Sequence, residues 1–147
     1  MARPVNDVDI GYRSPQEFWD EIVLAAAGRF ETQPTRAHAM ACAIYFTQFL
    51  DWVFHEKNPG EDTRHTVAYA TFKQKHLAAC PELRWLADLS DAVKQRGLGR
   101  RDVALKQRQG GEGSISESPI ELELIDGTRY HFAAVVMRAV DYWRSNR

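Results

Sequence analysis

The feature of the sequence that most constrains its fold is a long and almost wholly apolar segment at residues 36–57. Pro34 and Thr35 open this segment with helix-start signals, and Asn58-Pro59-Gly60 ends it. Its apolar members are Met40, Ala43, Tyr45, Phe46, Phe49, Leu50, Trp52, Val53 and Phe54. A helix that is apolar almost all round packs on several neighbours, so the segment predicts the central helix of a bundle.

Four further segments place apolar side chains at helical spacing. They are residues 15–30, 63–79, 81–96 and 133–144. Ser14-Pro15-Gln16-Glu17 carries a capping-box pattern at the first start, and Gly97 is typical of a left-handed helix C-cap. The inward positions expected in the second and third of these segments are Val67, Ala70, Phe72, Leu77, Trp85, Leu86, Leu89 and Val93. The sequence thus predicts a mainly α fold, a compact bundle of about five helices.

One β-hairpin is expected within this bundle, at about residues 120–132, before the C-terminal helix. Apolar and polar residues alternate there around Asp126-Gly127. A two-residue loop would mix the apolar and charged faces. A three-residue loop, Ile125-Asp126-Gly127, instead sets Leu122 opposite Tyr130, Glu123 opposite Arg129 and Glu121 opposite His131. We therefore expect the three-residue loop, with its apolar face docked on the helices.

Length and charge limit the class of protein. A chain of 147 residues fits one domain over 1–147, in which we expect 1–13 to be an N-terminal arm and 99–118 a flexible loop. The 19 basic and 20 acidic residues exclude a histone-like electrostatic binder. No apolar run approaches the ~20 residues of a membrane helix, and the N-terminus has no signal-peptide core. A cytoplasmic protein without membrane contact is the expectation.

The cysteines and glycines indicate no cofactor and no metal. Cys42 and Cys80 have no CxxC partner, which argues against a disulfide framework or a zinc ribbon, and both are expected in the core. The glycine-rich stretches at 97–99 and 110–113 follow no strand, so neither is a phosphate-binding loop. The four tryptophans are expected mainly in the core, with Trp143 near the C-terminus an alternative interface residue.

A narrow polar stripe on the central helix is the first candidate site. Thr47, Asp51 and His55 are spaced i, i+4 and i+8, so they align along one edge of that helix. An Asp–His pair can orient a general base or supply two metal ligands, although no third ligand stands at a suitable spacing. The alternative is that the stripe is the solvent edge of a largely buried helix.

A basic segment at residues 94–108 is the second candidate. It carries six basic side chains against Asp102 alone, a net charge of +5. The candidate phosphate-binding residues are Arg96, Arg100, Arg101, Lys106 and Arg108. Such a patch gives salt-dependent, non-specific affinity for nucleic acid, and the absence of an aromatic residue argues against base stacking. The alternative is a solvated loop balanced by the Glu-rich residues 112–123.

Three motifs at residues 49–99 carry a resemblance to known proteins. They are Asp51-Trp52-Val53, Cys80-Pro81-Glu82-Leu83, and the run from Leu86 to Lys94. With these motifs the segment, about a third of the chain, resembles a group of uncharacterised bacterial helical proteins. In those sequences the last motif ends more like Asn-Ala-x-Lys-His.

The arrangement of a helical bundle with this motif late in it is similar to HEPN-type domains. Those domains are often RNases of toxin–antitoxin and phage-defence systems, with an Arg-x(4–6)-His catalytic motif. None of the five histidines of this chain follows an arginine at that spacing, and Asp91 and Gln95 replace the Asn and His of the late motif. The resemblance therefore implies the bundle fold without the catalytic motif.

Three functional hypotheses follow, and whether the chain is an enzyme stays open among them. The first is a non-catalytic binding or regulatory module, acting as a homodimer or with another protein, in bacterial defence or mobile elements. The second is an RNA- or nucleotide-binding protein that uses the basic segment. The third is an enzyme built on Asp51 and His55.

Overall fold

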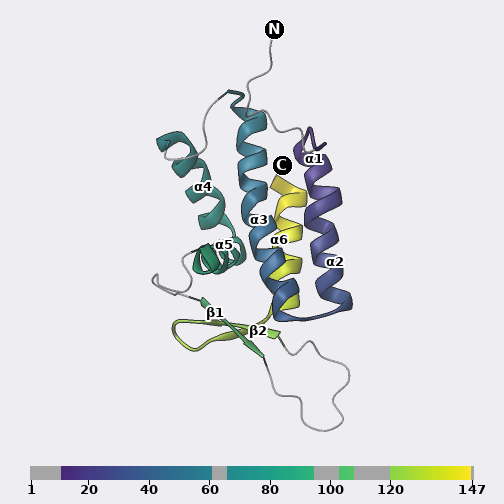
Figure 1. The fold of residues 1–147 in the computed structure, drawn as a ribbon. Coiled ribbons are helices and arrows are strands. Elements are labelled where there is room, and N and C mark those ends of the chain that lie inside the picture. The colour runs from purple at the N-terminus through teal and green to yellow at the C-terminus, as the bar shows by residue number, and fades with distance from the viewer. Residues whose placement is uncertain (1–10, 61–65, 95–102, 108–119, 147) are drawn as a thin grey trace.

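Five helices and a small antiparallel sheet make up the described part of the chain, residues 11–60, 66–94, 103–107 and 120–146 of a computed structural model (Figure 1). The helical elements are α1 (Pro15–Phe18), the π-helical turn η1 (Trp19–Val23), α2 (Leu24–Thr32), α3 (Arg36–Lys57), α4 (Val67–Ala79), α5 (Pro81–Lys94) and α6 (Phe132–Asn146). The strands are β1 (Val103–Gln107), β2 (Ile120–Leu124) and β3 (Arg129–His131). Because α1, η1 and α2 follow one another without a break, they form a single helix, and the predicted mainly α fold is confirmed.

Side-chain caps define where the helices begin. The hydroxyl oxygen of Ser14 accepts a hydrogen bond from the Glu17 N–H at 3.2 Å, and that of Thr35 accepts one from the His38 N–H at 3.1 Å. Thr66 caps α4 in the same way. Each cap satisfies a backbone donor that has no partner within the helix, and the caps at Ser14 and Thr35 mark boundaries that the sequence predicts. The start of α4 differs, because the helix expected from residue 63 begins at Val67.

The π-helical turn adjusts the first helix to the core. The N–H of Leu24 reaches the carbonyl oxygen of Trp19, five residues earlier, rather than the usual four. The wider turn allows the adjacent Phe18 and Trp19 both to be buried while Val23 and Phe30 further along remain in the core. An unbroken α-helix would turn every later side chain by about 100° relative to this arrangement.

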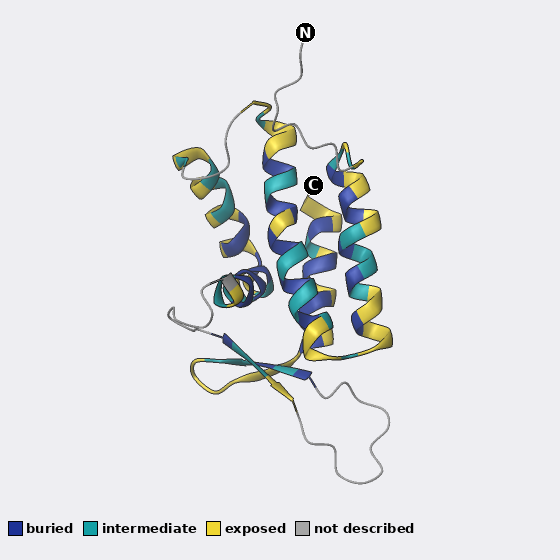
Figure 2. Ribbon diagram, viewed as in Figure 1, coloured by how far each residue is buried: buried dark blue, intermediate teal, exposed yellow. Residues whose placement is uncertain are grey.

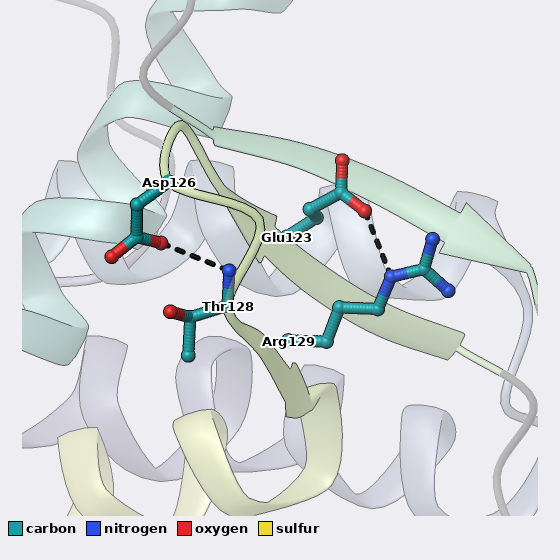
Figure 3. A network of polar contacts seen from close by, with 4 residues as sticks. All are labelled: Glu123, Asp126, Thr128 and Arg129. Atoms are coloured by element: carbon teal, nitrogen blue, oxygen red, sulfur yellow. Dashed lines mark hydrogen bonds and ion pairs between the residues drawn. The ribbon is translucent and has the colours of Figure 1, made fainter.

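The hairpin formed by β2 and β3 has the predicted register. Glu121 lies opposite His131, Leu122 opposite Tyr130, and Glu123 opposite Arg129. The Arg129 Nε–H donates to Glu123 Oε2 at 2.8 Å, so one charged pair of that face forms an ion pair (Figure 3).

The turn of the hairpin is also the one that the sequence predicts. The backbone N–H of Leu124 donates to the carbonyl of Thr128 at 2.8 Å and thereby encloses a three-residue loop. Gly127 within it has φ +89°, a left-handed conformation that glycine adopts without steric cost. Asp126 Oδ1 accepts a hydrogen bond from the Thr128 N–H at 2.9 Å and tightens the turn (Figure 3).

The expectation of a loop over residues 99–118 is wrong for part of its length. Residues 103–107 form strand β1, which pairs antiparallel with β2 and sets Leu105 opposite Leu122 and Lys106 opposite Glu121. The strand forms because β2 offers it a matching alternation of apolar and charged side chains. The rest of the predicted loop, the arm at 1–10 and the predicted C-cap Gly97 lie outside the described residues.

The core centres on α3, as its apolar surface predicts. Helices α2, α3 and α6 run alongside one another, α5 packs across α3, and the sheet lies beneath α5 and the start of α6 (Figure 1). Phe46, Phe49 and Leu50 of α3 are fully buried, and Trp143 of α6 stands edge-on to Phe49 with ring centroids 5.1 Å apart. Trp143 is thus a core residue. Cys42 and Cys80 are buried free thiols, as expected.

Three residues expected in the core, Val67, Ala70 and Val93, are exposed. Val67 is 84% exposed and Val93 is 48% exposed. Val67 lies in the first turn of α4 and Val93 in the last turn of α5. Figure 2 shows the burial of each residue, with the buried faces of the helices toward the centre of the bundle and the exposed faces outside.

None of the described helices is both long enough and apolar enough to cross a membrane.

Candidate functional site

The structure gives the three residues of the polar stripe on α3 three different environments. Thr47 is only 9% exposed, and its hydroxyl donates to the carbonyl of Ala43 at 2.7 Å. Asp51 is half-buried and accepts a hydrogen bond from the Tyr69 hydroxyl of α4. His55 is exposed. The stripe is therefore aligned along α3, but α4 covers its middle, and the solvent-edge interpretation fits His55 alone.

The Asp51–Tyr69 hydrogen bond links α3 to α4. Burial raises the pKa of the Tyr69 hydroxyl, and the carboxylates of Asp51 and Asp91 raise it further. The phenol consequently stays protonated and remains a donor to Asp51. Within the described residues, this arrangement holds two helices together and leaves Asp51 already engaged.

The basic segment is described at only one of its five candidate residues. Lys106 is exposed on β1 and lies opposite Glu121 of β2. Arg96, Arg100, Arg101 and Arg108 lie outside the described residues. The predicted phosphate-binding patch therefore stays a prediction.

A cluster that the sequence analysis missed lies where α4, α5 and α6 meet. His76 of α4 is 5% exposed, and its Nδ1 shares a 2.5 Å hydrogen bond with the hydroxyl of Tyr142 in α6. The His76 ring also lies 4.9 Å from the ring of Trp143. Cys80, one turn after His76, donates its thiol hydrogen to Glu82 Oε2 at 3.5 Å.

An open pocket of about 500 Å³ lies beside this cluster. It is lined by Ala79, Cys80, Pro81 and Glu82 at the junction of α4 and α5, and by Arg138, Asp141, Tyr142, Ser145 and Asn146 on α6. We call this the Cys80–Tyr142 pocket. Arg138 and Asp141 are exposed, and neither forms an ion pair with a described residue. The described lining thus offers one guanidinium, that of Arg138, and two carboxylates, those of Asp141 and Glu82, beside a thiol and a phenol.

Three ionisable groups in or beside the pocket, Cys80, Tyr142 and the neighbouring His76, are shifted toward their neutral forms. Burial lowers the pKa of the His76 imidazole, and the positive charges of Lys57 and Lys75 lower it further. Burial also raises the pKa of the Cys80 thiol and that of the Tyr142 hydroxyl. A neutral imidazole, a thiol and a phenol are hydrogen-bonding groups, and none of them is an activated nucleophile.

No sequence signal identified this cluster. His76 and Tyr142 are 66 residues apart, so their contact depends on how α4 and α6 pack. The i, i+4 spacing of His76 and Cys80 is the one local sequence pattern that places two members of the cluster on the same side of a helix. Among the described residues, no group of three or more His, Cys, Asp or Glu side chains is arranged to hold a metal ion.

Comparison of the chain with protein-family models, with curated proteins and with solved structures gives no match.

Proposed function

We propose that this chain is a non-catalytic binding module that holds a small ligand in the Cys80–Tyr142 pocket. The observation that carries the proposal is the lining of this pocket. It combines the charged side chains of Arg138, Asp141 and Glu82 with Cys80 and Tyr142, whose pKa shifts favour the neutral forms. Concave sites with a few convergent polar groups are where small ligands bind.

Support for a binding role over turnover comes from protonation. A general base needs a pKa near the working pH and a nucleophilic cysteine needs a lowered one, whereas burial moves Cys80 and Tyr142 away from ionisation. An enzyme built on Asp51 and His55 is the weakest hypothesis, because Asp51 is already engaged by Tyr69 and His55 is exposed at the end of α3. Activity lost in Asp51→Ala would revive it.

The charges of the lining define the ligand class. The guanidinium of Arg138 is suited to a carboxylate or phosphate, and the carboxylates of Asp141 and Glu82 to an ammonium group. With both in one pocket, the complementary ligand carries an anionic and a cationic group within a few bonds of each other. Free amino acids and short peptides are the simplest molecules of this class.

The test is a thermal-unfolding screen of the full chain with a panel of free amino acids and dipeptides. A ligand that binds only the native state stabilises it by RT ln(1 + [L]/Kd), about 2.7 kcal/mol at 100 times Kd. We expect at least one member of the panel to raise the Tm by several degrees. A panel that leaves the Tm unchanged up to ~10 mM contradicts the proposed ligand class.

Two variants make the screen specific for the pocket. Arg138→Gln removes the cation of the lining and should abolish the shift in Tm. Arg84→Gln is the matched control, since Arg84 is an exposed arginine of α5 outside the lining, and it should keep the shift. Equal shifts in both variants would place the binding elsewhere on the chain.

RNA binding through the basic segment is the second candidate function, favoured by its net charge of +5 and by the exposure of Lys106 on β1. Fluorescence anisotropy of short single-stranded RNA tests it, because phosphate contacts weaken steeply between about 50 and 200 mM salt. A variant with Arg100, Arg101, Lys106 and Arg108 all changed to Ala should lose this binding. The similarity to HEPN-type domains supports a setting in bacterial defence, which is likewise a proposal, as is a cytoplasmic location.

A further inference from the structure

An apolar groove of about 320 Å³ lies between α2 and α6, on a different side of α6 from the Cys80–Tyr142 pocket. We call it the α2–α6 groove. Its lining includes Leu24, Ala27, Gly28 and Glu31 of α2, and Ala133, Met137 and Arg144 of α6. Met137 is 56% exposed although its neighbours on α6, Val136 and Val140, are buried. A thioether side chain left in solvent along an apolar groove is typical of a contact surface.

Gly28 in this groove leaves open space beside α2 in the described part of the chain. It lies inside α2, where glycine destabilises a helix relative to alanine. A Cβ atom built at Gly28 would meet nothing within 4 Å among the described residues. A glycine in a helix allows a second backbone to pack closely against it. Within the described chain, no other backbone lies that close to Gly28. A partner seated in the groove would supply such a backbone.

The charges of the groove lie at its two opposite ends. The rings of Phe30 and Phe132 are 4.9 Å apart, which places the end of α2 beside the start of α6, so the two helices are antiparallel. Glu31 is therefore at the end of the groove where α6 begins. Arg144 is twelve residues further along α6, about 18 Å away at 1.5 Å per residue. Neither side chain forms an ion pair with a described residue.

This distribution makes the groove complementary to itself. A two-fold axis through its midpoint brings Glu31 of each copy to Arg144 of the other, and it places Met137, about 7.5 Å along α6 from Phe132, close to the centre of the contact. We propose that the α2–α6 groove is the interface of a symmetric dimer of this chain. The interface combines a central apolar contact with two equivalent ion pairs at its rim.

Sedimentation velocity of the full chain between about 5 and 500 µM tests the dimer, since a weak symmetric interface dissociates on dilution. We expect the wild type to sediment as a dimer at the upper concentrations. Met137→Arg, which places a charge in the apolar centre, should sediment as a monomer with an unchanged helical circular dichroism spectrum. A monomeric wild type at every concentration, or a Met137→Arg variant that still dimerises, overturns the proposal.

Reversing the charges of Glu31 and Arg144 tests the two-fold arrangement. Glu31→Arg and Arg144→Glu should each weaken dimerisation on the order of tenfold, because each reverses one member of both ion pairs. The double variant Glu31→Arg/Arg144→Glu should restore the wild-type dissociation constant. Arg29→Glu, on α2 but outside the groove lining, is the control and should leave that constant unchanged. A double variant that dimerises no better than either single variant overturns the two-fold arrangement.

Discussion

The buried His76 is the single residue whose protonation should affect the fold most clearly. It lies between the hydroxyl of Tyr142 and the rings of Phe72 and Trp143, where a positive charge has lost most of its water. Its pKa is lowered in the native state by burial and by the nearby charges of Lys57 and Lys75, while the unfolded chain has the ordinary value of about 6.5. The unfolded chain therefore binds a proton at a higher pH than the native one.

The first prediction is a loss of stability in mild acid that depends on His76. Well above pH 6.5, His76 is neutral in both the native and the unfolded state, and its contribution to the free energy of unfolding is fully present. As the pH falls through about 6.5, the unfolded chain binds a proton before the native chain does. The free energy of unfolding therefore decreases. Urea unfolding at several pH values between 7.5 and 5 measures this slope. His76→Gln should flatten it.

The control for this pH dependence is another histidine. His55→Gln changes an exposed histidine at the end of α3, so its slope should match the wild type. A His76→Gln variant with the wild-type slope would show that some other group causes the acid sensitivity.

A second prediction concerns the two thiols. Burial raises the pKa of Cys42 to about 12 and also raises that of Cys80. Because the thiolate is the reactive form, both cysteines should react with an aromatic disulfide reagent at pH 8 only after unfolding in urea. One fast equivalent per native chain, lost in Cys80→Ala, would mean an activated thiol in the pocket and would count against a purely binding role.

At the level of elements, the hydrogen bond from Tyr69 to Asp51 is the contact that fixes α4 on α3. Tyr69→Phe keeps the ring, which packs on Phe54 and Phe72, and removes only the hydroxyl. A hydrogen bond to a charged group contributes about 1.5–3 kcal/mol, and its loss leaves a half-buried carboxylate without its donor. The third prediction is a decrease of this size in the free energy of unfolding, measured by urea titration.

Tyr45→Phe is the matched control for Tyr69→Phe. Tyr45 lies half-buried on α3, and its hydroxyl has no hydrogen-bond partner among the described residues, so its removal should change stability by less than about 0.5 kcal/mol. Equal losses in the two variants would mean that the Asp51 contact stabilises nothing.

The elements that the sequence predicts well are those whose signals are local. The helix over 36–57 is bounded by a cap at Thr35 and a stop at Asn58-Pro59-Gly60, and its structure has the same bounds. The hairpin register follows from alternation and from the need for glycine at 127. Strand β1 was missed because its five residues pair only with β2, more than a dozen residues later in the chain. The alternation within these five residues does not by itself predict a strand until the pairing with β2 is known.

The candidate site was harder to predict for the same reason. The i, i+4, i+8 stripe is a local pattern and was found, but its chemistry depends on α4, which covers Asp51 with Tyr69. The Cys80–Tyr142 pocket draws on the ends of three helices, and no local spacing reports how those ends meet. Sequence reasoning therefore located polar residues without showing which of them share a surface.

At the scale of the whole molecule, the described surface presents two features on different sides of α6. One is the polar Cys80–Tyr142 pocket and the other is the apolar α2–α6 groove, with no residue shared between their linings. Between them, the side chains of Trp143 and Ala139 belong to the core. A ligand in the pocket and a partner in the groove can therefore be tested by independent variants of the same chain.

The most direct measurement of the proposed function is isothermal titration calorimetry with the panel member that raises the Tm most. We expect one ligand per chain, binding lost in Arg138→Gln, and binding retained in Arg84→Gln and in Met137→Arg. Binding that is unchanged in Arg138→Gln, or turnover of the titrated molecule detected in the calorimeter cell, would contradict a non-catalytic ligand site in the Cys80–Tyr142 pocket.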